Sequence, residues 1–258
     1  MELGLIGRGA IGRYVAREVA SRGHEVSAVL VRPGRAAPGA VLEVEAAADI
    51  PETVDLMIDC AGHGALAAHG PEILARGVSM ITLSIGALAD RRLAGALDDA
   101  AEAGGSRLHL ASGAIGALDC LAAAKVGGLD EVTYTGRKPP QGWKGSPAEE
   151  TLDLYAMGTG AATHFEGSAR DAALAYPKNA NVAAAAALAG LGFDETRVRL
   201  IADPAIDRNV HEIAASGAFG RFSFQISGEA LPDNPRSSAL AAMSVLAKLD
   251  QITGRIAL

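Results

Sequence analysis

Short apolar runs alternate with helical spacing through the first part of the chain. Residues 2–6 and 25–31 are apolar runs of strand length, and residues 10–21 between them have the periodicity of an amphipathic helix. The same alternation predicts further strands at residues 56–60, 79–84 and 107–111, and further helices at residues 71–76 and 90–103. Strands that alternate with helices in this way indicate a parallel sheet with helices on both faces.

The pattern changes after residue 111. Apolar and polar residues now alternate one by one, as they do in strands with one exposed face. Such strands are predicted at residues 131–137, 197–202, 211–215 and 221–227, with helices at residues 115–125 and 181–189. Near the end, helical spacing predicts a last helix over residues 235–254, with one face buried through Leu240, Met243, Leu246 and Leu249.

The two patterns divide the chain into parts. We predict an α/β fold in which residues 1–111 form a Rossmann-type, doubly wound parallel sheet that binds a dinucleotide. Residues 112–234 are expected to form a second, α+β domain for substrate and catalysis, built on a mixed or antiparallel sheet. Residues 235–258 are expected to hold the C-terminal helix, which packs back on the first domain.

Composition and charge narrow the range of partners. The 258 residues carry a formal net charge of −7, which disfavours binding to the phosphate backbone of nucleic acid. Cys60 and Cys120 are too few for a disulfide framework or a zinc site, so we expect a reducing compartment and no metal. Neither a secretory leader nor a membrane-spanning apolar run is recognisable. We therefore expect a cytoplasmic protein with no membrane partner.

A glycine-rich turn joins the first predicted strand to the first predicted helix. Residues 7–12, Gly-Arg-Gly-Ala-Ile-Gly, match the pattern G-x-G-x-x-G. Between a strand and a helix, this pattern is typical of a pyrophosphate site in which helical N–H groups face the phosphates. We expect cofactor contacts at Gly7, Gly9, Ala10, Ile11 and Gly12. The alternative is a plain connection between strand and helix with incidental glycines.

The end of the second predicted strand bears on the choice of cofactor. An acidic residue there would bind the ribose hydroxyls of NAD, but this chain has Val31, followed by Arg32 and Arg35. Arginine forms forked, charge-assisted hydrogen bonds to phosphate. We therefore predict that NADP is at least accepted and that Arg32 contacts the cofactor. The alternative is that both arginines are solvated loop charges.

Other polar residues lie where the predicted parallel strands end, the edge at which ligands gather in such sheets. Ser84 is expected to contact the cofactor, and Ser112 and His63 are candidates for the substrate. Lys178, at a predicted helix start, is either a group that holds a substrate carboxylate or a plain surface lysine.

His211 is a candidate acid–base residue because the pKa of imidazole lies near neutrality. On the pattern alone, a lone histidine in a strand is more often structural. A carboxylate beside one ring nitrogen would fix its tautomer, but the sequence does not decide which carboxylate. For Arg137 and Lys138, as for Lys178, two roles stay open. Each of them either binds a substrate carboxylate or is a surface charge.

Several segments resemble the L-aspartate dehydrogenase family, in order along nearly the whole chain. Three of them are A-S-G-A-I-G-A-L-D at residues 111–119, P-K-N-A-N-V-A at residues 177–183, and A-D-P-A-I-D-R-N-V-H-E-I at residues 202–213. The others are at residues 4–12, 60–63, 84–90, 135–140, 217–220 and 234–238.

The resemblance implies oxidation of L-aspartate with NAD or NADP. The product would be iminoaspartate, which hydrolyses to oxaloacetate and ammonia or feeds quinolinate and NAD synthesis; the reverse reductive amination is equally open. The resemblance also implies that His211 is catalytic and that Ala114 and Asn181 contact the cofactor. Some members carry an aspartate where this chain has Val31, which argues against a strict preference for NAD.

Two other functions stay open at this point. One is another NAD(P)-dependent reductase of a small dicarboxylate or amino acid, such as dihydrodipicolinate reductase or homoserine dehydrogenase. The chain lacks the H-H-x-x-x-K sequence expected of the first and is short for the second. The other is a non-catalytic protein that senses the redox state of a dinucleotide. We expect a homo-oligomer, with a dimer as the simplest form.

Overall fold

The computed structural model describes residues 1–177, 179–232 and 234–256, with the backbone alone at residues 235 and 236. Contacts between Cα atoms group these residues into two compact units. Unit 1 consists of residues 1–113 together with the chain from residue 241 onward, and unit 2 consists of residues 114–240.

Unit 1 is built on a six-stranded sheet in the order β3-β2-β1-β4-β5-β6, and every neighbouring pair is parallel. This confirms the predicted parallel sheet. Strand β3 is an addition, because a run of three residues is too short to show a periodicity. The strands are β1 (Glu2–Ile6), β2 (Glu25–Leu30), β3 (Leu42–Val44), β4 (Leu56–Asp59), β5 (Ser79–Thr82) and β6 (Leu108–Leu110).

The helices of unit 1 cover both faces of this sheet. They are α1 (Ala10–Val19), α2 (His63–Ala75), α3 (Arg91–Gly104) and α8 (Ala239–Thr253), with short 3-10 turns at Ala20–Arg22, Ala47–Asp49 and Ile85–Ala89. Helices α1 and α8 share one apolar cluster with the strands, and α2 and α3 share another. Because side chains along a strand alternate between faces, Leu3 and Leu5 pack in the first cluster and Ile6 in the second.

Two helices of unit 1 differ in extent from the residues assigned to them in the sequence. Helix α2 includes residues 71–75, as predicted, but it is longer and begins at His63. The alanine- and glycine-rich residues before Pro71 have no apolar stripe, so periodicity alone does not reveal that they are helical. The last helix begins at Ala239 rather than at residue 235, because residues 234–238 form a strand instead.

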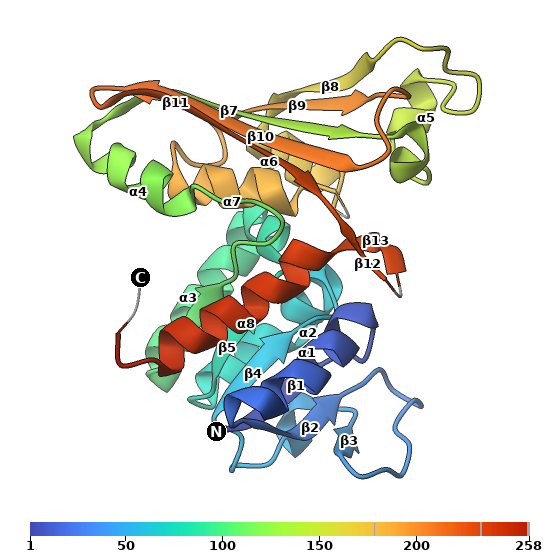
Figure 1. Cartoon of the computed structure of the whole chain (residues 1–258). Coiled ribbons are helices and arrows are strands. Elements are labelled where there is room, and N and C mark those ends of the chain that lie inside the picture. Colours follow the sequence, from blue (N-terminus) through green and yellow to red (C-terminus); the bar gives the residue numbers. More distant parts are fainter. Residues whose placement is uncertain (178, 233, 257–258) are drawn as a thin grey trace. The chain divides into compact units, whose positions relative to one another are not determined.

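Unit 2 is built on a five-stranded sheet in the order β11-β10-β7-β9-β8 (Figure 1). Strands β7 and β9 are parallel and the other neighbours antiparallel, so the sheet is mixed, as predicted. A short pair, β12 (Ala230–Leu231) and β13 (Asn234–Ser238), follows it. The sheet strands are β7 (Leu129–Lys138), β8 (Ala162–Ser168), β9 (Arg197–Ala202), β10 (Asn209–Gly217) and β11 (Gly220–Gly228).

Helices cover one face of the mixed sheet. They are α4 (Leu118–Gly127), α6 (Ala169–Ala175) and α7 (Asn181–Ala189), whereas α5 (Ala148–Thr151) and the 3-10 turn Pro140–Trp143 lie near one end of the strands (Figure 1). The alanines of α7 are almost all buried, since small side chains let the helix lie close to the strands. Along β7 the buried positions alternate, at Val132, Tyr134, Gly136 and Lys138. These four residues therefore share one face of the sheet.

None of the helices in the described ranges is both long and apolar enough to cross a membrane.

The apolar contact of α8 with the sheet of unit 1 can be tested by truncating Leu249, which is fully buried. We expect Leu249→Ala to lower the free energy of unfolding by about 2–5 kcal/mol, because it removes buried apolar surface and leaves a cavity. Urea unfolding followed by circular dichroism measures this loss. Met243→Ala, on the same helix at a residue that is 47% exposed, is the matched control. Equal midpoints for the two variants would contradict the described packing.

Candidate active site

Two positions of the glycine-rich turn have no room for a side chain. Gly7 has a φ of 85°, and a Cβ there would lie 2.9 Å from Cβ of Ala61. A Cβ on Gly12 would lie 2.5 Å from the carbonyl oxygen of Gly7. Both distances are below those of real carbon contacts, so the fold itself requires glycine at these two positions.

Gly9 differs from them, because a Cβ at this position would meet nothing within 4 Å. Its φ of −69° is also open to any residue. Gly9 precedes α1 and makes no side-chain cap hydrogen bond, and the first N–H groups of a helix have no partner within the helix. The space beside Gly9 and a helix start of this kind fit the pyrophosphate of a dinucleotide.

The loop after β2 is held by acidic residues of β3 and of the segment that follows it. Arg8 of the glycine-rich turn pairs with Glu43 at 2.6 Å and donates to the carbonyl oxygen of Arg35 at 3.0 Å. Glu45 accepts from the backbone N–H groups of Arg35 and Ala36. Sequence reasoning did not include Arg8, Glu43 or Glu45 as site residues, because their contacts join segments that are distant in the sequence.

The two arginines proposed for the 2′-phosphate are on this loop. Arg32 and Arg35 are exposed, and Val31 is buried in the apolar cluster with α1 and α8. The side chain of Arg32 has no ion-pair partner among the described residues. A free, exposed guanidinium is what a phosphate contact needs, and the role of Arg32 stays a prediction.

A buried carboxylate organises the ends of β4 and β5. Asp59 is fully buried and accepts hydrogen bonds from Oγ1 of Thr82 at 2.8 Å, Oγ of Ser84 at 2.5 Å and the N–H of Ala61 at 2.9 Å. The hydroxyl of Ser84 therefore donates its proton inward, which leaves its oxygen to accept from a ligand. Asp59 was missed in the sequence, although a single acid that ends an apolar strand is a signal for such a role.

His63 and Ser112 lie in unit 1, where parallel strands end. His63 is the first residue of α2 and is half-buried, directly after Gly62, whose φ is 94°. Ser112 follows β6 and is half-buried, and the next N–H, that of Gly113, donates to Oγ of Ser244 in α8. Both candidates therefore follow the carboxyl ends of strands, and their contact with substrate stays a prediction.

In unit 2, His211 is only 4% exposed and is hydrogen-bonded to a phenol. Its Nδ1 lies 2.8 Å from Oη of Tyr134. His211 is on β10 and Tyr134 on the neighbouring β7, so the contact is set by strand register. The sequence had suggested a carboxylate as the partner. The adjacent Glu212 instead accepts from Oγ of Ser223.

The surroundings of His211 keep its ring neutral. Burial, and then the charge of Lys138, lower the pKa of His211 to about 3. Burial raises the pKa of Tyr134 well above its usual range, so the phenol stays protonated. With Nδ1 bonded to Tyr134, Nε2 is the nitrogen left to exchange a proton with a substrate.

Lys138, the last residue of β7, is 8% exposed and lies on the same face of the sheet as Tyr134. Its Nζ is 2.6 Å from Oδ1 of Asn179 and 4.9 Å from the ring centroid of Trp143. Burial lowers the pKa of Lys138 to about 8. Its neighbour Arg137 alternates to the other face and pairs with Asp203 at 2.7 Å. Arg137 is thus occupied by an ion pair and Lys138 is buried, and a role of either in substrate binding stays a prediction.

The remaining predicted site residues are distributed as follows. Asn181 begins α7, two residues after Asn179, and Ala114 is a half-buried residue in the segment that leads to α4. Lys178 lies outside the described residues. Within the described ranges, no group of three or more His, Cys, Asp or Glu side chains is placed to hold a metal ion.

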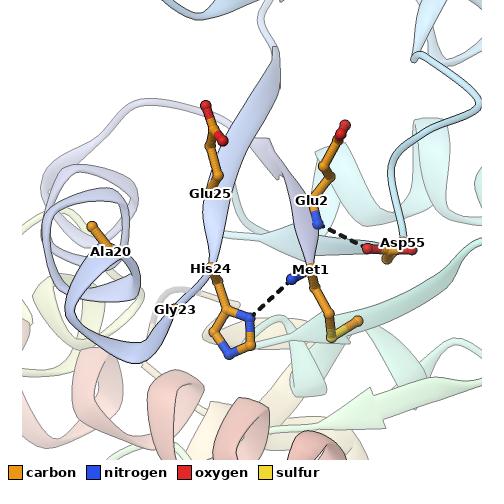
Figure 2. Close-up of a pocket in the computed structure, with 7 residues that line it drawn as sticks. All are labelled: Met1, Glu2, Ala20, Gly23, His24, Glu25 and Asp55. Carbon is orange, nitrogen blue, oxygen red and sulfur yellow. Dashed lines mark hydrogen bonds between the residues drawn. The ribbon is translucent and has the colours of Figure 1, made fainter.

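A surface hollow lies where β1 and β2 begin (Figure 2). The glycine-rich turn, by contrast, follows the carboxyl end of β1. The hollow is at the amino ends of β1 and β2, where the N-terminal amine is 3.5 Å from Nδ1 of His24 and the N–H of Glu2 donates to Asp55. None of the predicted site residues lines it. Ligands in parallel sheets bind at the carboxyl ends, so this hollow is not the nucleotide site.

Comparison with known families divides the chain at nearly the same place. Residues 119–252 match the family model described as "Aspartate dehydrogenase, C-terminal". Residues 7–111 match the model described as "Homoserine dehydrogenase, NAD binding domain". The second match is confined to the nucleotide-binding part, whereas the part with His211 and Lys138 matches the first.

Relatives extend over almost the whole chain. A Ruegeria pomeroyi protein named L-aspartate dehydrogenase is 58% identical, with 97% of this chain and 92% of that protein covered. Its counterpart of the same name from Cupriavidus taiwanensis is 47% identical, with 96% of each covered. The crystal structure of an aspartate dehydrogenase from Thermotoga maritima matches with a TM-score of 0.79 at 28% identity, covering 100% of this chain and 99% of that one.

The different constraints on Gly9 and Gly12 can be separated by experiment. We expect Gly9→Ala to leave the melting temperature unchanged but to weaken NADPH binding by roughly tenfold or more, because the new methyl group enters the phosphate space. Gly12→Ala should instead lower the melting temperature, since its Cβ collides with the backbone of Gly7. Thermal melts and quenching of nicotinamide fluorescence measure the two effects. Wild-type affinity in Gly9→Ala would rule out the pyrophosphate site at this turn.

Proposed function

The chain belongs to the aspartate dehydrogenase family, and on that premise we propose that it oxidises L-aspartate with NAD or NADP. The product is iminoaspartate, which is hydrolysed to oxaloacetate and ammonia or passed on to quinolinate and NAD synthesis, and the same site supports the reverse reductive amination. The observation that carries the proposal is the buried, neutral His211, which shares a sheet face with the buried cation Lys138.

Residues of unit 1 are proposed to hold the cofactor. Gly9 and the first N–H groups of α1 bind the pyrophosphate, and the oxygen of Ser84 accepts from the ribose. Arg32 meets the 2′-phosphate when NADP is used, and Ala114 and Asn181 are proposed contacts from unit 2. A dinucleotide held by these residues would supply the hydride acceptor for oxidation at Cα of the substrate.

His211 is proposed to move the proton that accompanies this oxidation. As the C–H bond at Cα breaks, the amine nitrogen forms a double bond to Cα and loses a proton. Nε2 of His211 is neutral and accepts that proton, and Tyr134 holds the ring through Nδ1. Water then adds to the imine and ammonia leaves, and His211 returns its proton in this step.

The remaining assignments are proposals of the same kind. Residues 1–111 serve the dinucleotide, residues 112–234 serve substrate and catalysis, and the helix within residues 235–258 supports the first part. Ser112 and His63 are proposed substrate contacts. We also propose that the protein is a cytoplasmic homo-oligomer without nucleic-acid or membrane partners, and its net charge of −7 supports the exclusion of nucleic acid.

The direct test supplies L-aspartate with NAD or NADP at alkaline pH and follows the absorbance of the reduced nicotinamide. We expect turnover with at least one cofactor. We expect His211→Gln to lower kcat by roughly two to four orders of magnitude, because it removes the proton acceptor. His24→Gln, at the amino edge of the sheet in unit 1, is the matched control and should keep wild-type kcat. A protein that binds cofactor but oxidises no small amino acid would be a sensor instead.

Tyr134 is proposed as a positioning residue that acts through His211. We expect Tyr134→Phe to lower kcat by about tenfold with little change in the KM for aspartate, because the ring loses its fixed orientation. The phenol oxygen also stabilises the protonated imidazole, so its loss should move the acid limb of kcat/KM to lower pH. Tyr155→Phe, at a residue that is 77% exposed in the same unit, is the control. An unchanged pH profile would leave Tyr134 with a packing role alone.

A further inference from the structure

Lys138 is a buried cation with only neutral partners. Its ammonium contacts the amide oxygen of Asn179 and the face of Trp143. No carboxylate in the described part of the chain lies within ion-pair distance of Nζ. Buried lysines are ordinarily paired with an acid, because removing a charge from water costs free energy that neutral dipoles recover only in part. The described residues around Lys138 thus provide no negative charge to balance its ammonium group.

We propose that Nζ of Lys138 binds a carboxylate of the amino-acid substrate, and that Asn179 holds the ammonium in place for it. The proposal rests on the proposed function and adds to it the group that recognises the acid. Lys138 is suited to this role by its place in the sheet. His211 pairs with Gly136 in the register of β10 and β7, and Lys138 lies two residues further along β7.

Such diagonal neighbours on one face have Cα atoms roughly 7–8 Å apart. The two functional groups are therefore close enough for one small amino acid to reach both. Its amine would meet Nε2 of His211, and one of its carboxylates would meet Nζ of Lys138.

The other cations of this part of the sheet are less suited. Arg137 is on the opposite face and is already paired with Asp203. Lys144 is exposed, and its Nζ lies 4.2 Å from the ring centroid of Tyr155. Of these three side chains, Lys138 alone combines burial, a position on the face of His211 and the lack of a counter-charge.

Binding at Lys138 would also act on His211. The charge of Lys138 contributes to the low pKa of His211, after burial. A carboxylate on Lys138 cancels that charge, so the pKa of His211 rises as substrate arrives and the imidazole becomes a better proton acceptor. The same carboxylate raises the pKa of Lys138 from about 8, so binding near pH 8 takes up protons.

The test uses succinate, a dicarboxylate without an amine, as an inhibitor of L-aspartate oxidation by the full chain with NADP+. We expect Lys138→Met to raise the inhibition constant of succinate and the KM of L-aspartate by about tenfold to one hundredfold, with NADPH affinity unchanged. Lys144→Met is the matched control and should keep all three values. Unchanged succinate inhibition in a folded Lys138→Met protein would overturn the proposal.

Asn179→Asp is a second variant that does not depend on leaving a cavity. It places a carboxylate beside Lys138 without changing the size of the side chain, so the folded state gains an ion pair. The new carboxylate then occupies the ammonium group that would otherwise bind the carboxylate of the substrate. We expect a melting temperature at or above that of the wild type and succinate inhibition weakened at least tenfold. Wild-type succinate affinity in Asn179→Asp would contradict a carboxylate site at Lys138.

Calorimetry gives a readout that a packing role for Lys138 would not change. Titration of succinate at pH 8, in HEPES and in Tris, yields the number of protons taken up from the difference in heat between the buffers. We expect uptake by the wild type and little or none by Asn179→Asp. Equal uptake by both proteins would overturn the proposal.

The failure of this inference can be told apart from the failure of the proposed function. If the wild type oxidises L-aspartate and both variants keep wild-type KM and succinate inhibition, the function stands and Lys138 is not the carboxylate ligand. If the wild type binds succinate with proton uptake, and the variants do not, but L-aspartate is not oxidised, the carboxylate site stands and the reaction is wrong.

Discussion

The burial of an ammonium and an imidazole on one sheet face is the constraint on which the arrangement of unit 2 depends. Lys138 and His211 are both nearly inaccessible, and their printed partners are the neutral side chains of Asn179, Trp143 and Tyr134. Burial lowers the pKa of both groups, and the charge of Lys138 further lowers the pKa of His211. Burial within unit 2 therefore keeps the imidazole neutral, as the proposed chemistry requires.

Tyr134 and Asn179 complete that arrangement with neutral groups. A carboxylate in place of Tyr134 would favour the charged imidazole, and a carboxylate in place of Asn179 would satisfy the ammonium. With a phenol and an amide, His211 stays neutral and Lys138 keeps its charge without a counter-ion. Both groups thus remain available to a ligand. This choice of neutral partners is what distinguishes the site from a structural ion pair.

In unit 1, by contrast, the buried carboxylate is satisfied within the fold. Asp59 accepts three hydrogen bonds and so fixes the loops that follow β4 and β5. A Cβ on Gly7 would collide with the side chain of Ala61 and one on Gly12 with the backbone of Gly7, so of these three glycines only Gly9 faces open space. The glycine-rich turn is therefore closely packed at Gly7 and Gly12 and open at Gly9, where the phosphates are expected to bind. The family matches divide the chain in a similar way, since the NAD-binding model matches residues 7–111 and the aspartate dehydrogenase model matches residues 119–252.

The sequence alone determined the alternation of strands and helices, the glycine-rich turn and the mixed character of the second sheet. These features follow from local periodicity and from steric rules for glycine, so they can be read along the chain. The candidate His211 came from a resemblance, because a lone histidine carries no pattern of its own. Strand β8 was missed in the sequence because its residues are half-exposed on both faces.

Only the tertiary structure decided which residues meet. Tyr134 and His211 are 77 residues apart, and Lys138 and Asn179 are 41 apart, so no local pattern connects them. Their contacts depend on the register of β7 with β10 and on where α7 begins. The burial that lowers the pKa of Lys138 likewise comes from neighbours distant in sequence. Local periodicity fixes which face a side chain takes, but the groups packed against that face are fixed by long-range packing.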